Sequence, residues 1–100
     1  SREIRLNIKY VNLNDELVVL DISDQIVLIE PEGYRFFNTY DTEDFEAYID
    51  LDEVQIGDNI RVVKIRSPQG VQINTKEPEI VRVTIASYSK ENSQAEQEQN

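Results

Sequence analysis

The residues best able to do chemistry in this sequence are the carboxylates in its middle. Seven acidic residues lie between positions 41 and 53, namely Asp41, Glu43, Asp44, Glu46, Asp50, Asp52 and Glu53. Carboxylate oxygens are the ligands that Ca²⁺ requires, yet the D-x-D-x-D-G spacing of a calcium loop is missing. Since Glu46 and Asp50 alternate with apolar residues, the pattern favours the solvent-facing side of a strand over a cation site.

Five aromatic residues accompany these carboxylates. They are Tyr34, Phe36, Phe37, Tyr40 and Tyr48. Such a group most often closes a small β core while the tyrosine hydroxyls stay in water, and this is the favoured interpretation. The alternative is a platform on which a sugar or a peptide stacks. Segment 34–53 therefore defines a second functional hypothesis, a cell-envelope module that binds a sugar or a cation.

The sequence offers no catalytic machinery. It contains no histidine and no cysteine, which excludes imidazole bases, thiol nucleophiles, disulfides and Cys/His zinc sites. Ser67, Thr75 and Ser87 thus lack a histidine base, and the three glycines form no phosphate-binding or nucleophile-elbow motif. Paired carboxylates can hydrolyse glycosides, but 20 acidic residues form such pairs by chance. We predict no enzyme, no catalytic residue, no cofactor and no metal site.

The charge of the chain argues against two classes of partner. Its net charge is -10, and such an acidic surface repels nucleic acid and anionic lipid. The basic residues Arg61, Lys64, Arg66 and Arg82 lie in the second half. No apolar stretch reaches the roughly 18 residues of a membrane span, so we expect no direct insertion of this segment into a membrane. Because the chain begins at Ser1 and contains no methionine, we expect it to be a segment of a longer protein.

Strands must position these side chains, because apolar residues alternate with a period of two along most of the chain. Residues 4–9 alternate in this way and predict a strand that ends near Asn12. Further strands are predicted over residues 17–20, 26–29, 45–51, 59–66, 71–74 and 80–87. A chain of 100 residues can bury one small core and no more. The sequence therefore predicts a single, mostly β domain.

Two segments depart from this period. Pro31 and Glu32 suit the first turn of a helix, and Tyr34, Phe37 and Tyr40 recur every third residue, which predicts a short helical turn. After Tyr88 the sequence is polar, and burial of its one alanine cannot offset the entropy of ordering. We expect a β domain over residues 1–88 and a disordered acidic and polar tail over residues 89–100.

The two ends of this domain form an internal repeat. A shift of 54 positions superimposes residues 4–29 on residues 58–83. It places Leu6 on Ile60, Ile8 on Val62, Val27 on Val81, and the turn residue Asn14 on Pro68. We predict a duplicated three-strand unit with approximate two-fold symmetry, in which both halves contribute to one core. Residues 31–56 form the insert between them.

Over residues 3–86 the sequence resembles the YbbR-like domain. The resemblance lies in the order of short motifs: Phe45-Glu46-Ala47-Tyr48-Ile49-Asp50-Leu51, then Gly57, then Ser67-Pro68-Gln69-Gly70-Val71, then Pro78 before an alternating strand. Glu30-Pro31 departs from the family pattern, which commonly has a glycine there. The resemblance implies a small β domain similar in fold to the C-terminal domain of L25-type ribosomal proteins.

The resemblance also implies a non-catalytic function. YbbR-like domains occur as tandem repeats outside the cytoplasmic membrane of bacteria, and many regulate a membrane-bound diadenylate cyclase, which makes cyclic di-AMP. We therefore expect an interaction domain on the extracytoplasmic face of a bacterial cell membrane, tethered by an upstream transmembrane helix that this segment lacks. The expected partners are a membrane protein such as the cyclase and neighbouring YbbR-like repeats.

Overall fold

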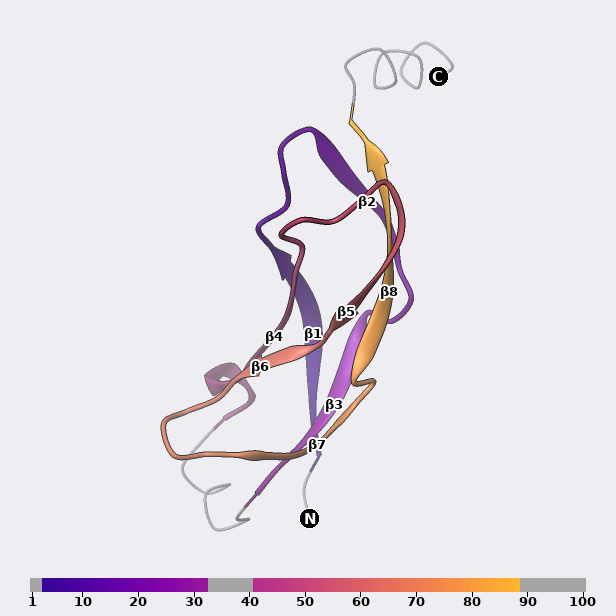
Figure 1. Ribbon diagram of the computed structural model, residues 1–100. Helices are drawn as coiled ribbons and strands as arrows, with labels where there is room; N and C mark the ends of the chain where they lie inside the picture. The colour runs from indigo at the N-terminus through magenta and orange to yellow at the C-terminus, as the bar shows by residue number, and fades with distance from the viewer. Residues whose placement is uncertain (1–2, 33–40, 89–100) are drawn as a thin grey trace, which may run out of the picture.

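Short strands account for most of the computed structural model, which describes residues 3–32 and 41–88. The mostly β prediction is confirmed (Figure 1). In chain order the elements are β1 (Ile4–Val11), β2 (Leu17–Ile22), β3 (Ile26–Pro31), the 3-10 helix η2 (Thr42–Asp44), β4 (Glu46–Asp50), β5 (Gly57–Val62), β6 (Lys64–Arg66), β7 (Ile73–Glu77) and β8 (Ile80–Ser87). The predicted tail over residues 89–100 lies outside the described residues.

The prediction that Pro31 begins a helix is wrong. Pro31 is the last residue of β3, where it is buried and pairs with Ile73 of β7. The pairing register shifts between Glu30 and Pro31, and a strand tolerates proline beside such a bulge because no ladder hydrogen bond from its nitrogen is needed. Residues 33–40 lie outside the described residues, and the helical turn that the structure describes is η2.

Two predicted strands also need correction. The strand expected over residues 59–66 is divided at Val63, whose amide donates to the carbonyl of Glu79 over 2.9 Å. The division lets β5 pair with β8 while β6 pairs with β4. The strand expected over residues 71–74 is β7, Ile73–Glu77, because Val71 still belongs to the preceding turn.

The strands form two sheets. One has the order β6-β4-β1-β3-β7, and the other has the order β2-β8-β5. β1 and β4 run parallel, whereas the other described pairs are antiparallel. Figure 1 shows the long β8, in orange to yellow, beside β2 and β5.

The predicted duplication is confirmed, and its halves exchange strands. β1 pairs with β3 as β5 pairs with β8, whereas β2 pairs with β8 and β7 pairs with β3. The exchanged pairs correspond residue by residue after a shift of 54 positions: Val19 opposes Ile85 as Ile73 opposes Pro31. Even the bulges coincide, since the register skips Leu20 in β2 and Asn74 in β7. The order β7-β3-β1 of one sheet is thus repeated as β2-β8-β5 in the other.

The first strands of the two halves, β1 and β5, align after a shift of 55 positions, and not 54 as predicted. Ile8 donates from its amide to the carbonyl of Gln25, and Val63 donates to that of Glu79, both over 2.9 Å. Ile8 therefore corresponds to Val63 and not to Val62. Because side chains alternate between the faces of a strand, this single residue reverses the expected faces of β5. Ile60 and Val62 are 57% and 51% exposed, whereas Leu6 and Ile8 are buried.

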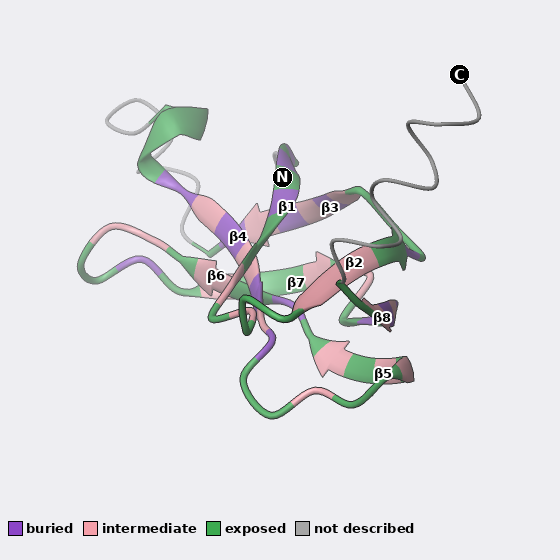
Figure 2. Ribbon diagram, turned by 90° about the horizontal axis from the view of Figure 1, so that it is seen from above, coloured by how far each residue is buried: buried purple, intermediate pink, exposed green. Residues whose placement is uncertain are grey.

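Both halves contribute to one core, as predicted. Buried residues alternate with exposed or half-buried ones along β1, β4 and β8 (Figure 2). The core consists of Ile4, Leu6, Ile8, Ile22, Val27, Ile29, Phe45, Ala47, Ile49, Leu51, Val63, Val71, Val81, Val83 and Ile85. Among the described residues no charged or polar side chain is buried with them. The acidic side chains therefore lie on the surface of this apolar core.

Candidate functional site

The carboxylates of segment 41–53 lie apart in the structure. Within residues 3–32 and 41–88, no group of three or more acidic side chains could hold a metal ion. Glu46 accepts a hydrogen bond from Arg66 over 3.0 Å, and Asp44 accepts one from the amide of Asp41 over 2.8 Å. These two carboxylates thus have local partners at the start of β4.

The carboxylate of Asp50 connects the turn after β1 with the loop after β4. Its Oδ1 accepts hydrogen bonds from Asn12 Nδ2 and from the amide of Asp52, each over 3.0 Å. These two bonds, the one from Asn12 above all, hold the pKa of the Asp50 carboxyl below its ordinary value, and the charges of Lys64 and Arg61 act in the same direction. Asp50 is therefore a structural anion between the end of β1 and the end of β4.

The aromatic residues of the proposed platform do not form one within the described residues. Tyr34, Phe36, Phe37 and Tyr40 lie outside those residues. Tyr48 lies on the outward face of β4, where the guanidinium carbon of Arg66 is 4.4 Å from the ring centroid. This cation–π contact occupies one face of the ring. No described contact therefore supports a sugar platform at Tyr48.

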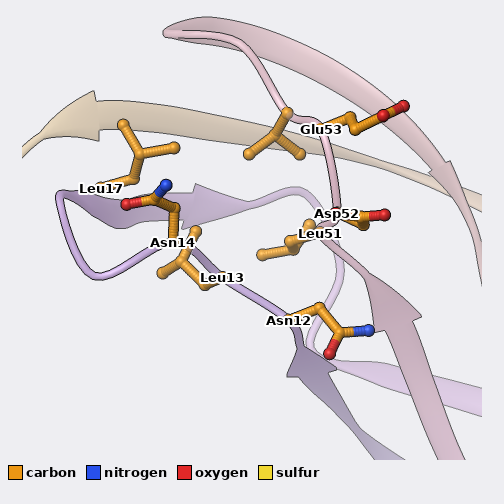
Figure 3. A pocket seen from close by; sticks show the side chains of 8 residues that line it. Asn12, Leu13, Asn14, Leu17, Leu51, Asp52 and Glu53 are labelled. Carbon is orange, nitrogen blue, oxygen red and sulfur yellow. The ribbon is translucent and has the colours of Figure 1, made fainter.

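The structure instead brings together two segments that the sequence analysis did not connect. The turn between β1 and β2 and the loop between β4 and β5 enclose an open depression of about 650 Å³ (Figure 3). We call it the loop depression, and it is lined by Asn12, Leu13, Asn14, Leu17, Leu51, Asp52, Glu53 and Val54. Of these residues, Asp52 and Glu53 belong to the acidic cluster that the sequence analysis singles out.

The loop depression has an apolar floor and a polar margin. Leu51 is buried, and Leu13, Leu17 and Val54 are half-buried against the core. Figure 3 shows Leu13, Leu17 and Leu51 gathered from both segments, while the carboxylates of Asp52 and Glu53 point away from them. The surface can therefore offer apolar contact in the middle and negative charge beside it.

Hydrogen bonds hold both walls of the loop depression in place. Arg61 donates from Nε to the carbonyl of Asp50 over 3.0 Å and from Nη2 to that of Asp52 over 3.2 Å. The Leu17 amide donates to the carbonyl of Asn14 over 3.0 Å. Asn12 and Glu53 adopt left-handed backbone conformations, with φ values of 64° and 58°. Such conformations cost energy in residues other than glycine and persist only where surrounding contacts maintain them.

The three hydroxyl residues of the sequence analysis, Ser67, Thr75 and Ser87, lie in a turn and in two strands. Ser67 Oγ donates to the carbonyl of Val71 over 2.8 Å and closes the turn before β7. Thr75 lies in β7, and Ser87 ends β8 opposite Leu17. The part of the chain that the structure describes contains no helix long and apolar enough to cross a membrane.

Solved structures with a similar fold are known. A crystal structure of a YbbR family protein from Desulfitobacterium hafniense matches 87% of this chain and 98% of its own, with a TM-score of 0.74 and 18% identity. The chain has a YbbR-like fold. The YbbR-like domain of the lmo2119 protein from Listeria monocytogenes matches 89% of this chain and 96% of its own, with a TM-score of 0.71 and 18% identity.

A third solved structure extends the comparison to another organism. Protein BH0266 from Bacillus halodurans matches 89% of this chain and 77% of its own, with a TM-score of 0.72 and 19% identity. No protein-family model and no curated protein matches the chain. The resemblance drawn from the sequence motifs is therefore confirmed at the level of the YbbR-like fold, and the protein contains a small β domain of this kind.

Proposed function

We propose that this YbbR-like domain is a non-catalytic interaction domain that acts on the extracytoplasmic face of a bacterial membrane. In this proposal an upstream transmembrane helix tethers the domain, and the domain regulates a membrane-bound diadenylate cyclase. Neighbouring YbbR-like domains are further partners. The YbbR-like fold over most of the chain is the observation that carries the proposal. The cyclase enters through the resemblance of the sequence motifs, which implies a family whose members regulate such an enzyme.

The chemistry of the described residues agrees with a function in binding. The surface offers a preorganised depression between two loops, and the chain supplies neither histidine nor cysteine to act as a base or a thiol nucleophile. The hydroxyl of Ser67 is committed to a backbone carbonyl. A domain with these features can change the activity of a partner by occupying part of its surface.

The test removes the domain from the full-length protein and leaves any membrane tether in place. We expect the cellular level of cyclic di-AMP to change and co-purification of the cyclase to fall. Deletion of residues 89–100 alone is the matched control and should change neither. If removal of the whole domain leaves both the nucleotide level and co-purification unchanged, the domain does not regulate the cyclase.

A further inference from the structure

We infer that the loop depression docks an extended segment of a protein partner in which a bulky apolar side chain is flanked by Lys or Arg. The inference rests on the proposed function in so far as it gives an interaction domain the surface with which it binds. It concerns the turn of residues 12–17 and the loop of residues 51–54, which together line this depression.

The size and floor of the loop depression suit an apolar side chain. Its volume of about 650 Å³ is within the range of about 300 to 1,000 Å³ typical of ligand pockets. Leu13, Leu17 and Val54 are half-buried against the core, and their remaining exposed surface lines the depression above the buried Leu51. Covering that patch with an apolar side chain removes further apolar surface from water.

The internal duplication provides a second copy of the turn that carries Leu13. The second copy of this turn has the same hydrogen bond, since Val71 donates to the carbonyl of Pro68 over 3.0 Å as Leu17 donates to that of Asn14. At the position of Leu13 the second copy has Ser67. The two residues differ in what they contact: Ser67 donates to the carbonyl of Val71, whereas Leu13 packs against the core and leaves part of its side chain at the loop depression. That exposed part of Leu13 is available for contact with a partner.

The negative charge around the loop depression favours a partner with basic residues beside its apolar side chain. Five carboxylates belong to residues 11–17 and 50–56, and no Lys or Arg does; they are Asp15, Glu16, Asp50, Asp52 and Glu53. The guanidinium of Arg61 reaches this region and binds the carbonyls of Asp50 and Asp52, and the charge of Lys64 also acts on Asp50. A partner with Lys or Arg beside its apolar residue therefore gains attraction, which the net charge of -10 extends to longer range.

The same charges disfavour other occupants. A second copy of this chain brings another ten negative charges, and residues 89–100 contain three glutamates, one lysine and one alanine. An anionic membrane surface is repelled by the five carboxylates. A basic and apolar segment of another protein is the occupant that matches both the floor and the margin.

The test titrates the isotope-labelled 100-residue chain with the peptide acetyl-KLKKLK-amide and follows backbone amide shifts by NMR. Shifts confined to residues 12–17 and 51–54 are expected, with weaker binding as salt rises. Peptide KSKKSK keeps the charge without the leucines, and ELEELE keeps the leucines with the opposite charge. Neither should bind. Equal binding of KLKKLK and KSKKSK, shifts elsewhere, or preferential binding of anionic vesicles would overturn the inference.

Matched variants connect the binding to the depression. Leu13→Ser introduces the residue found in the second turn and should raise the dissociation constant for KLKKLK about tenfold. Ile60→Ser makes a similar change at an exposed residue of β5 and should leave the affinity unchanged. The double substitution Asp52→Lys/Glu53→Lys should abolish binding, whereas Glu77→Lys/Glu79→Lys, with the same change in charge, should weaken it only slightly. Unchanged binding by Leu13→Ser in a folded chain contradicts the inference.

A cellular experiment separates this inference from the proposed function. Leu13→Ser in the full-length protein should reduce co-purification of the cyclase as removal of the domain does. If removal acts and Leu13→Ser does not, the proposed function stands and the docking surface is wrong. If neither acts while KLKKLK still binds to residues 12–17 and 51–54, the docking surface stands and the proposed regulation is wrong.

Discussion

At the scale of single residues, Ile49 at the centre of β4 belongs to the core that the two halves share. Ile49 is fully buried, and β4 lies between β1 and β6, which belong to different halves of the duplication. Ile49 therefore contacts a core made by both halves. On the opposite face of the strand, Glu46 has only an exposed ion pair with Arg66.

Ile49→Ala should lower the free energy of unfolding by about 2 to 5 kcal/mol, because it removes buried methyl groups and leaves a cavity. Glu46→Ala should lower it by about 0 to 1 kcal/mol, as is typical of exposed ion pairs. Urea denaturation followed by circular dichroism measures both changes. Similar losses for the two variants would show that the assignment of the faces of β4 is wrong.

The second residue-scale prediction concerns Asp50 and pH. Its pKa is lowered in the folded protein, chiefly by the hydrogen bond from Asn12 and then by that from the Asp52 amide. The charged form is thus favoured by folding, so this stabilisation is complete above the ordinary pKa of 3.8 and is lost as pH falls through the folded value. NMR titration should place the midpoint of Asp50 below 3.8.

Asn12→Gly tests the cause of that shift, because glycine accepts the left-handed conformation of Asn12 and removes only its side chain. The midpoint of Asp50 should rise towards its ordinary value in this variant. An unchanged midpoint would mean that the hydrogen bond from Asn12 does not stabilise the carboxylate.

At the scale of elements, the loop that leads into β5 ends in a glycine with a positive φ angle. Gly57, the first residue of β5, has a φ of 103°, and a Cβ added there would meet no atom within 4 Å. Gly57→Ala should therefore destabilise the domain by about 1 to 2 kcal/mol through backbone strain alone. Chemical denaturation measures the loss, with Gln55→Ala as a control in the same loop. An unaffected Gly57→Ala variant would show that β5 begins without that conformation.

At the scale of the whole molecule, the exchange of strands makes the halves interdependent. β2 of the first half pairs with β8, and β7 of the second half pairs with β3. Buried residues of both halves belong to one continuous core. The domain should therefore fold as one cooperative unit, unlike an array of independent repeats.

Separate fragments of residues 1–40 and 41–100 test this interdependence. Each alone should give the narrow amide dispersion of an unfolded chain in NMR spectra, because each lacks the partner of its exchanged strand. The intact chain should unfold in a single transition reported equally by both halves. A folded fragment, or two separate transitions in the intact chain, would contradict the exchange as the source of cooperativity.

The extent to which the sequence predicts the fold can be judged from particular residues. The order of strands along the chain, the core role of Ile49 and the repeat of 54 positions follow from periodic apolar residues, because a period of two is a local property of a strand. The faces of β5 do not follow. Ile60 and Val62 look like core residues in the sequence, yet the break at Val63 brings the half-buried Asn59 and Arg61 to the inner side.

The sequence by itself thus determined the class of fold, the duplication and the resemblance to YbbR-like domains, since these depend on local periodicity and on the order of short motifs. Only the tertiary structure decided which strands exchange partners and where a surface for binding lies. Leu13 and Val54 line the same depression. The two segments that carry them are connected by the hydrogen bond from Asn12 to Asp50, which are 38 positions apart. No local pattern encodes such a meeting, because it results from the parallel pairing of β1 with β4, which carries both strands to the same end of the sheet.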